Sequence, residues 1–397
     1  MKYSDFSILA VLFFFIIVLF SACDQPQDEW QGTIEEVDGV TVVKNPISPY
    51  EVKGEPSELV IEEEFSIDTE KDEIAEIGLV DILGFDIDSE GIIYVYQNPE
   101  RYKGHLVYRF DSRGIFSNSF GIMGQGPGEI ESPNNVNIFD KNEIQIQDDN
   151  KSKLLFFNGQ GDLIRETKIS LPSTGITILF PLRNNNYLSS TDIFDVSSKH
   201  RFDVLELYDS QFQKLKELDR CDYGLLIAAS QSKKVGSPFV FIHQINNEKI
   251  FVGHENRGYE ILVFDLDGSL QKKIQKQFES ANPPQAFIEL LLINMGPYKD
   301  RIIVPKKMPP FHNFFLDDAG RLYVKTYEKG ENENEYIHDI FNPDGIFIAR
   351  KSMPSFDAWM KPGARLNGAK AKNGQFYCIR EKESGYKELV VYKMIWQ

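Results

Sequence analysis

Asp88-Ser89-Glu90-Gly91-Ile92-Ile93-Tyr94-Val95 is the stretch that decides the fold. An apolar run at 82–87 leads into this polar turn, and a β-branched and aromatic run leads out of it. This is the pattern of an antiparallel β-hairpin with a tight turn. Residues 317–324 repeat it closely, and looser copies stand at 140–144, 183–188, 246–252 and 373–377. The sequence therefore predicts six hairpins of one type.

A second repeated signal follows most of these hairpins. It is an apolar strand that ends in an aromatic residue and an Asp or Asn, usually with Gly three residues later. Two such signals per unit give four strands, and four-stranded repeats of roughly 40 to 50 residues are typical of propeller blades. We therefore predict an all-β, six-bladed β-propeller with four-stranded antiparallel blades. The copies are Phe110-Asp111, Phe157-Asn158, Tyr208-Asp209 (without the Gly), Phe264-Asp265 and Phe341-Asn342, with Tyr392 alone near the chain end.

The last unit is one strand short, and the beginning of the chain offers a strand to complete it. Residues 58–67 alternate apolar and polar side chains, as a half-buried strand does, but belong to no local hairpin. The final unit has a hairpin at 366–379 and a third strand at 388–396. We expect the N-terminal strand to close the ring and remove two exposed sheet edges. The propeller then spans residues 57–397.

Residues 1–22 have the features of a signal peptide. Lys2 precedes an uninterrupted apolar run at 8–20, and Ser21-Ala22-Cys23 places small residues before a cysteine. This resembles the signal peptide of bacterial lipoproteins, in which Cys23 becomes the lipidated first residue. The alternative, an uncleaved anchor, usually needs a longer apolar run. The resemblance implies export across the inner membrane and lipid anchoring to the outer membrane, on its periplasmic or its surface face.

Two segments fall outside the repeat. Residues 23–56 are polar and proline-containing, which predicts a tether. Within them Asp38-Gly39 predicts a small hairpin that either lies on the propeller surface or stands free. Residues 282–295 predict one helix, with Asn282 as its cap, Pro283 at the first position and Gly296 as its stop. This helical insertion joins two blades, and it either roofs the channel mouth or fills a packing role.

The loop Gly124-Gln125-Gly126-Pro127-Gly128-Glu129 follows the first blade. A phosphate-binding loop would need Lys and Ser or Thr after its glycines, so an inter-blade turn is favoured. Together with the two repeated signals and the leader Trp30…Asp38-Gly39-Val40…Asn45-Pro46, this loop resembles six-bladed β-propeller lipoproteins of Bacteroidetes-type bacteria, relatives of the NHL-repeat propellers. The resemblance covers residues 58–397. The resemblance implies a fold and a location in the cell envelope, but it says little about a reaction or a ligand.

Composition excludes several function classes. A net charge of −17 makes the chain a poor partner for nucleic acid and does not favour electrostatic adsorption to anionic lipid. Cys221 and Cys378 lie in different units, so we expect two unpaired thiols. The six His residues show no metal-ligand spacing, and no nucleophile motif is present. We therefore expect a monomer without a metal or cofactor.

Candidate ligand-binding residues follow from propeller geometry. Ligands bind where groups from several blades converge at the channel mouth. That face carries the starts of the inner strands and the loops between the second and third strands. For each of these residues, the alternative is ordinary solvation of a loop. The candidates are Asn134, Asn135, His243, His312, Asn313, Arg365 and Asn367 on the inner strands, and Arg101, Tyr102, Asp149, His254, Arg257 and Tyr336 in the loops.

Two functions from different classes remain open. In the first, the protein is a lipid-anchored binding module that engages a glycan, a peptide or an envelope protein at the channel mouth. In the second, it is a hydrolase resembling the calcium-dependent lactonase propellers, with Asn135, Asn313 and Asn367 contributing oxygen ligands. No carboxylate at an inner-strand start completes that set. We therefore favour the binding module over an enzyme.

Overall fold

The computed structural model describes residues 29–97, 104–140, 143–149, 152–171, 175–225, 232–246, 248–332, 334–354 and 368–397. The chain divides into two compact units, Met1–Gly32 and Thr33–Gln397. The predicted signal peptide and the lipidation site Cys23 lie outside the described residues.

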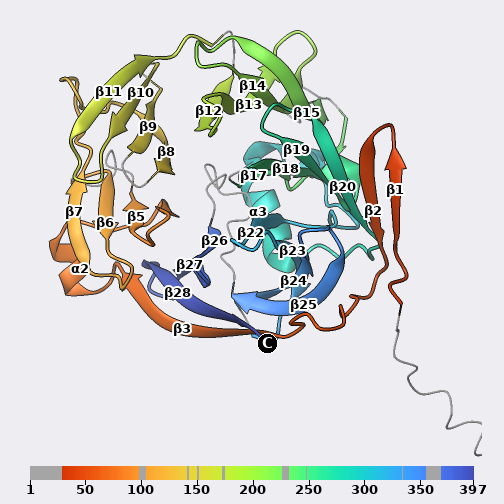
Figure 1. The fold of residues 1–397 in the computed structure, drawn as a ribbon. Coiled ribbons are helices and arrows are strands. Elements are labelled where there is room, and N and C mark those ends of the chain that lie inside the picture. The colour runs from red at the N-terminus through yellow and green to blue at the C-terminus, as the bar shows by residue number, and fades with distance from the viewer. Residues whose placement is uncertain are drawn as a thin grey trace, which may run out of the picture. The chain divides into compact units, whose positions relative to one another are not determined.

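The described part of the second unit contains six blades, each with four antiparallel strands, that succeed one another around a ring (Figure 1). The predicted six-bladed β-propeller is therefore confirmed. The first blade has β4 (Gly84–Ile87), β5 (Ile93–Tyr96), β6 (Val107–Phe110) and β7 (Phe116–Phe120), and the second has β8 (Pro133–Asp140), β9 (Glu143–Asp148), β10 (Lys153–Phe157) and β11 (Leu163–Lys168). The third has β12 (Ile176–Pro181), β13 (Tyr187–Asp195), β14 (His200–Tyr208) and β15 (Lys214–Leu225), and the fourth has β17 (Phe241–Ile245), β18 (Lys249–His254), β19 (Glu260–Asp265) and β20 (Leu270–Lys276). The fifth has β22 (Asn313–Leu316), β23 (Leu322–Lys329), β24 (Glu335–Phe341) and β25 (Phe347–Pro354), and the sixth has β26 (Ala369–Lys372), β27 (Gln375–Glu381), β28 (Lys387–Trp396) and β3 (Leu59–Asp68).

The repeated signals mark the two turns of each blade on one side of the sheet. In the turn between β6 and β7, the Asp111 carboxylate accepts hydrogen bonds from the Arg113 and Ile115 backbone N–H groups at 2.9 Å each. Gly114 takes the left-handed backbone, with φ 78°, which favours glycine. In the third blade, which lacks this glycine, Phe212 adopts the positive φ of 59° instead. The signal is therefore a local turn motif, and this explains why it can be read from the sequence.

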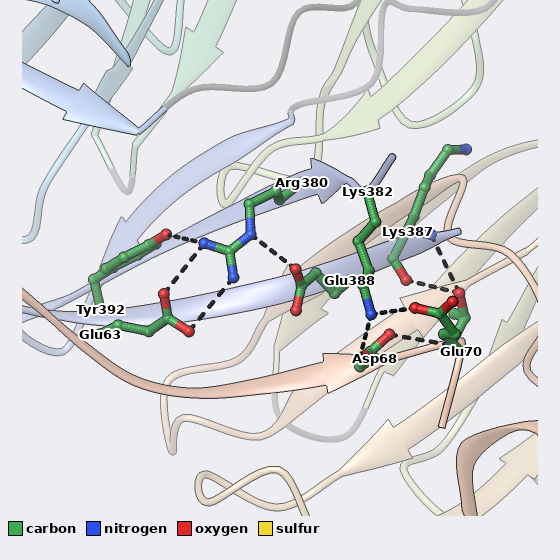
Figure 2. A network of polar contacts seen from close by, with 9 residues as sticks. Glu63, Asp68, Glu70, Arg380, Lys382, Lys387, Glu388 and Tyr392 are labelled. Atoms are coloured by element: carbon green, nitrogen blue, oxygen red, sulfur yellow. Dashed lines mark hydrogen bonds and ion pairs between the residues drawn. The ribbon is translucent and has the colours of Figure 1, made fainter. Parts of the chain in front are cut away.

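The N-terminal strand closes the ring, as predicted. β3 pairs antiparallel with β28, with Ile67 opposite Leu389 and Leu59 opposite Trp396. Figure 2 shows the polar network over this pairing, with side chains from β3, β27 and β28 and from the segments just after β3 and β27. Within it, Arg380 contacts Glu63 at 3.2 Å. The sixth blade lacks the full second signal because its outermost strand comes from the other end of the chain.

The small hairpin belongs to the fourth blade, which settles the choice the sequence leaves open. β1 (Thr33–Val37) pairs with β2 (Val40–Asn45), and β2 lies parallel to β20, extending that sheet to six strands (Figure 1). Asn45 is buried, and its amide nitrogen donates to the carbonyl oxygens of Gln275 at 3.0 Å and Gly345 at 2.9 Å. Its side-chain oxygen accepts from the Phe347 N–H at 2.8 Å. The hairpin thus ties the fourth blade to the fifth.

Replacing this amide should weaken the propeller. Asn45→Ala removes the side-chain partner of one buried carbonyl, one partly buried carbonyl and one buried N–H, so we expect a loss of about 1–3 kcal/mol in the free energy of unfolding. The measurement is urea unfolding followed by circular dichroism. Lys44→Ala is the matched control, because the ion pair of Lys44 with Glu35 is about half exposed and such pairs contribute little. Equal midpoints for the two variants would contradict the structural role of the hairpin.

The predicted helix is present between the fourth and fifth blades. α3 spans Gln285–Met295 and ends at Gly296, but it begins after Pro284, two residues later than expected. Asn282 does not cap it; its side-chain oxygen instead accepts from Lys307 Nζ at 3.0 Å. Phe287 and Leu291 pack against Tyr327 and Tyr336 of the fifth blade. Several short elements had no recognisable signal in the sequence. α2 (Asp72–Glu76) precedes the first blade, and η2 (Glu255–Arg257) lies between two strands of the fourth blade. The others are near the helix: β16 (Lys234–Val235), η3 (Gly296–Arg301) and β21 (Ile302–Ile303).

Candidate functional site

A pocket of about 460 Å³ lies beside η2, on the face where the inter-blade segments gather. Five separate segments build its wall: the end of β15, residues 235–238, the loop with η2, residues 278–280 and residues 305–310. This volume is within the range of small-molecule sites. The pocket therefore unites parts of the third blade, the fourth blade and the helical insertion.

Glu255 fixes the floor of the pocket to the segment before β17. One of its carboxylate oxygens accepts a hydrogen bond from the Ser237 hydroxyl, and the other accepts from the Val240 N–H at 3.0 Å. Burial raises the pKa of Glu255 despite these bonds. The carboxylate thus holds the 235–238 segment in place and lines the pocket at the same time.

A buried ion pair holds the neighbouring loop. Asp219 of β15 is 6% exposed, and it accepts hydrogen bonds from both terminal nitrogens of Arg257, one of them at 2.7 Å. His254 Nε2 lies 3.7 Å from the same carboxylate, and His254 Nδ1 accepts from the Asn256 N–H at 3.2 Å. Burial opposes ionisation of Asp219, but His254 and Arg257 outweigh it and lower its pKa. These contacts fix η2 against the third blade.

Two further contacts shape the wall on the side of β15. The Tyr223 hydroxyl donates to Asp203 at 2.9 Å, and burial followed by the Asp203 charge raises the pKa of Tyr223 well above its ordinary value. The Asn256 amide nitrogen donates to the Asp222 carbonyl at 2.9 Å and lies 3.3 Å from Cys221 Sγ. Burial likewise raises the pKa of Cys221, to about 12, so this free thiol packs rather than reacts. Tyr223 and Asn256 are thus held rigidly at the pocket wall.

The opposite wall comes from the insertion. Lys307 lines the pocket and is held by its hydrogen bond to Asn282. Phe278 also lines the pocket and is 36% exposed. Carboxylate, amide, hydroxyl and ammonium groups therefore face the same space as an aromatic ring and several prolines. Such a surface can form hydrogen bonds and apolar contacts with one ligand.

The structure brings together two of the residues predicted from the sequence, His254 and Arg257. Both support the pocket from beneath rather than line it. Of the rest, Asp149 lies in the loop after β9, where it accepts from Gln147 at 2.9 Å. The prediction for Tyr336 was wrong. This residue lies in β24, not in a loop, and it is buried beneath α3. The loop before β24 is shorter than the spacing in the sequence suggested.

The inner-strand candidates have local partners of their own. The Asn135 amide donates to Asn137 at 3.1 Å, and the His243 ring packs 4.7 Å from the Phe180 ring. The His312 ring lies 5.8 Å from that of Tyr327, and Asn313 accepts from the Phe314 N–H at 2.7 Å. Asn134 lies in β8, but its side chain is not described. Arg101, Tyr102, Arg365 and Asn367 lie outside the described residues.

Sequence reasoning missed the residues that line the pocket. Glu255 and Asn256 stand between two residues that it did select, so the loop itself was recognised. Tyr223 and Lys307 belong to an outer strand and to the insertion, and neither carries a motif. Only the folded chain brings them to the same place.

Within the described ranges, no group of three or more His, Cys, Asp or Glu side chains is arranged to hold a metal ion. The helices described there are also too short or too polar for any of them to cross a membrane.

Comparisons with known proteins agree with the fold. A family model described as a 6-bladed beta-propeller matches residues 69–241. A Bacteroides vulgatus member of the DUF4221 family shares 12% identity, with 86% of this chain and 100% of that chain covered and a TM-score of 0.53. A Bacteroides fragilis protein described as a putative exported protein shares 12% identity. The match covers 89% of this chain and 100% of that chain, with a TM-score of 0.48. Regucalcin, a calcium-binding protein from Agrobacterium tumefaciens, shares 9% sequence identity with this chain. The match covers 80% of this chain and 92% of regucalcin, with a TM-score of 0.36.

No curated protein matches the chain in sequence. At these identities the solved structures show the fold alone. The predicted six-bladed β-propeller is confirmed by the family match over residues 69–241, and the fold of the Bacteroides vulgatus protein agrees with it.

Proposed function

Since the chain belongs to the six-bladed β-propellers, with neighbours in fold among Bacteroides proteins, we propose that it is a cell-envelope binding module with its ligand site in the pocket beside η2. The observation that supports this most is the way the pocket is built. Side chains from five segments face one space, and buried polar contacts such as Asp219–Arg257 and Glu255–Val240 N hold two of those segments in place. Preorganised polar groups of this kind favour binding because little order is lost when a ligand arrives.

We propose a hydroxyl-rich ligand, a glycan of the envelope or the diet. Sugar hydroxyls both donate and accept, and the pocket offers acceptors in Glu255 and Asn256 and a cationic donor in Lys307. The Phe278 ring supplies a face for the apolar side of a sugar ring. No cofactor enters this proposal. Lipid anchoring through Cys23 would keep the module at the membrane, and a peptide or an envelope protein is the competing ligand class.

Replacing Lys307 tests the site. With the purified full chain titrated into neutral oligosaccharides, we expect saturable binding, and Lys307→Ala should raise Kd by about tenfold because one charge-assisted hydrogen bond is lost. Isothermal titration calorimetry measures it. Lys306→Ala is the matched control, because this exposed neighbour does not line the pocket.

Two results would overturn the proposal. One is the absence of saturable binding to every oligosaccharide together with saturable binding to peptides. The other is calcium-dependent hydrolysis of lactones that is lost on chelation, which would favour the hydrolase.

A further inference from the structure

The insertion beside the pocket exposes several large apolar side chains. On α3 and η3 these are Leu292, Ile293 and Tyr298, which are 36%, 71% and 38% exposed. Val235 of β16 and Ile303 of β21, at 62% and 45% exposed, face each other across a parallel strand pair. Gly236 packs directly against the side chains of Leu291 and Ile302, so the strand pair and the helix adjoin. We call these five side chains the apolar patch.

Several cationic residues stand next to the apolar patch in the sequence. Lys233, Lys234, Lys299 and Lys306 flank it in the sequence, and none of them forms an ion pair with another described residue. Arg301 lies with its guanidinium carbon 5.6 Å from the centre of the Tyr298 ring. The chain as a whole carries a charge of −17. Glu289 and Asp300 are the acidic residues of the same segments, so residues 233–236 and 285–307 keep a net positive charge, opposite in sign to that of the chain as a whole.

We propose that the apolar patch and its lysines dock on an anionic membrane surface. Apolar and tyrosine side chains enter the interface between lipid headgroups and acyl chains, while surrounding lysines contact the headgroup charges. The negative net charge of the whole chain disfavours adsorption to anionic lipid. Salt screens charges that lie more than about 8 Å from the membrane surface, however, so the lysines beside the apolar patch determine the electrostatic attraction once the patch is in contact. An acidic protein surface would pair with the lysines, but it would not explain why Ile293 is exposed. A bilayer explains both features, because it offers anionic headgroups to the lysines and an apolar interior to Ile293.

Docking of this kind has a consequence for the pocket. Val235 belongs to the apolar patch and also lines the pocket. The pocket would therefore open at the lipid interface, where a membrane-linked ligand could reach it. The docking itself does not depend on the proposed ligand, so it is tested without one.

A fluorophore at Ile293 tests the docking. The full chain carrying Cys23→Ser, which removes the predicted lipid anchor and its thiol, together with Ile293→Cys is labelled with an environment-sensitive dye. Cys221 and Cys378 are buried and stay unlabelled. Vesicles of phosphatidylcholine, with or without phosphatidylglycerol, carry brominated acyl chains as quencher. We expect quenching at residue 293 at least twofold stronger than at Gln160→Cys, an exposed turn of the second blade, and stronger still with phosphatidylglycerol.

Charge reversal separates docking from insertion of any other segment. Lys299→Glu with Lys306→Glu should lower the docked fraction by roughly fivefold for each lysine lost. Lys71→Glu with Lys168→Glu makes the same charge change at exposed sites near the first and second blades and should leave quenching unchanged. Equal quenching at 293 and 160, or equal effects of the two reversals, would overturn the proposal.

Discussion

Removing residues 24–67 is expected to leave an aggregated or molten chain. The deletion takes away β3, in which Leu59 and Ile67 are each 1% exposed, and it leaves β28 as an open edge. Burial of each such side chain contributes about 1.5–3 kcal/mol as an upper estimate, against a net stability of about 5–15 kcal/mol for a typical domain. Near-ultraviolet circular dichroism and thermal melting measure the outcome. Deleting only 24–32, which precedes the propeller unit, should be nearly silent.

Point variants separate the role of β3 from that of the hairpin, which the longer deletion also removes. Leu59→Ala and Ile67→Ala should each cost about 2–5 kcal/mol, because both side chains are fully packed. Glu62→Ala, on the exposed side of the same strand, is the matched control. If the three variants unfold at the same denaturant concentration, β3 does not close the ring.

Asp219→Asn is expected to produce the second large effect. The change leaves Arg257 without the carboxylate that binds two of its nitrogens, and breaking a buried pair costs about 3–5 kcal/mol. Because Arg257 is 24% exposed, we expect the lower end of that range. Urea unfolding at pH 7 measures it, and Asp222→Asn, whose side chain is 47% exposed, is the matched control.

The same pair predicts a dependence on pH. The folded pKa of Asp219 is lowered, so its contribution is fully present above the unfolded pKa of about 3.9 and is lost as pH falls through the folded value. The wild type and Asp219→Asn should therefore differ most at neutral pH and converge as pH falls below about 4. A constant difference over the whole range would show that Asp219 acts through packing rather than charge.

The fold could be predicted because its signals are local. Asp111 and Gly114 form their turn within five residues, so the signal survives in sequence whatever the rest of the chain does. Ring closure was also predictable, since the last blade visibly lacked a strand. The parallel pairing of β2 with β20 was not, because nothing in the hairpin's own sequence specifies a distant partner.

The candidate site was predicted only in part. His254 and Arg257 were found because they occupy a loop on the expected face. The residue that binds Arg257 is Asp219, 38 positions away in an outer strand, and Lys307 comes from an insertion that belongs to no blade. Sites built from non-repeating segments leave no periodic signal. Side chains such as Tyr336 were misplaced because strand ends shift by a few residues.

Hydrogen exchange with and without saturating oligosaccharide tests the central claim, a ligand site beside η2, most directly. We predict slower exchange of backbone amides at 235–238, 255–258 and 305–310, with the outer turns of the second blade unchanged as an internal reference. Slower exchange confined to the inner strands, such as β8 and β26, would place the ligand in the channel and contradict the account.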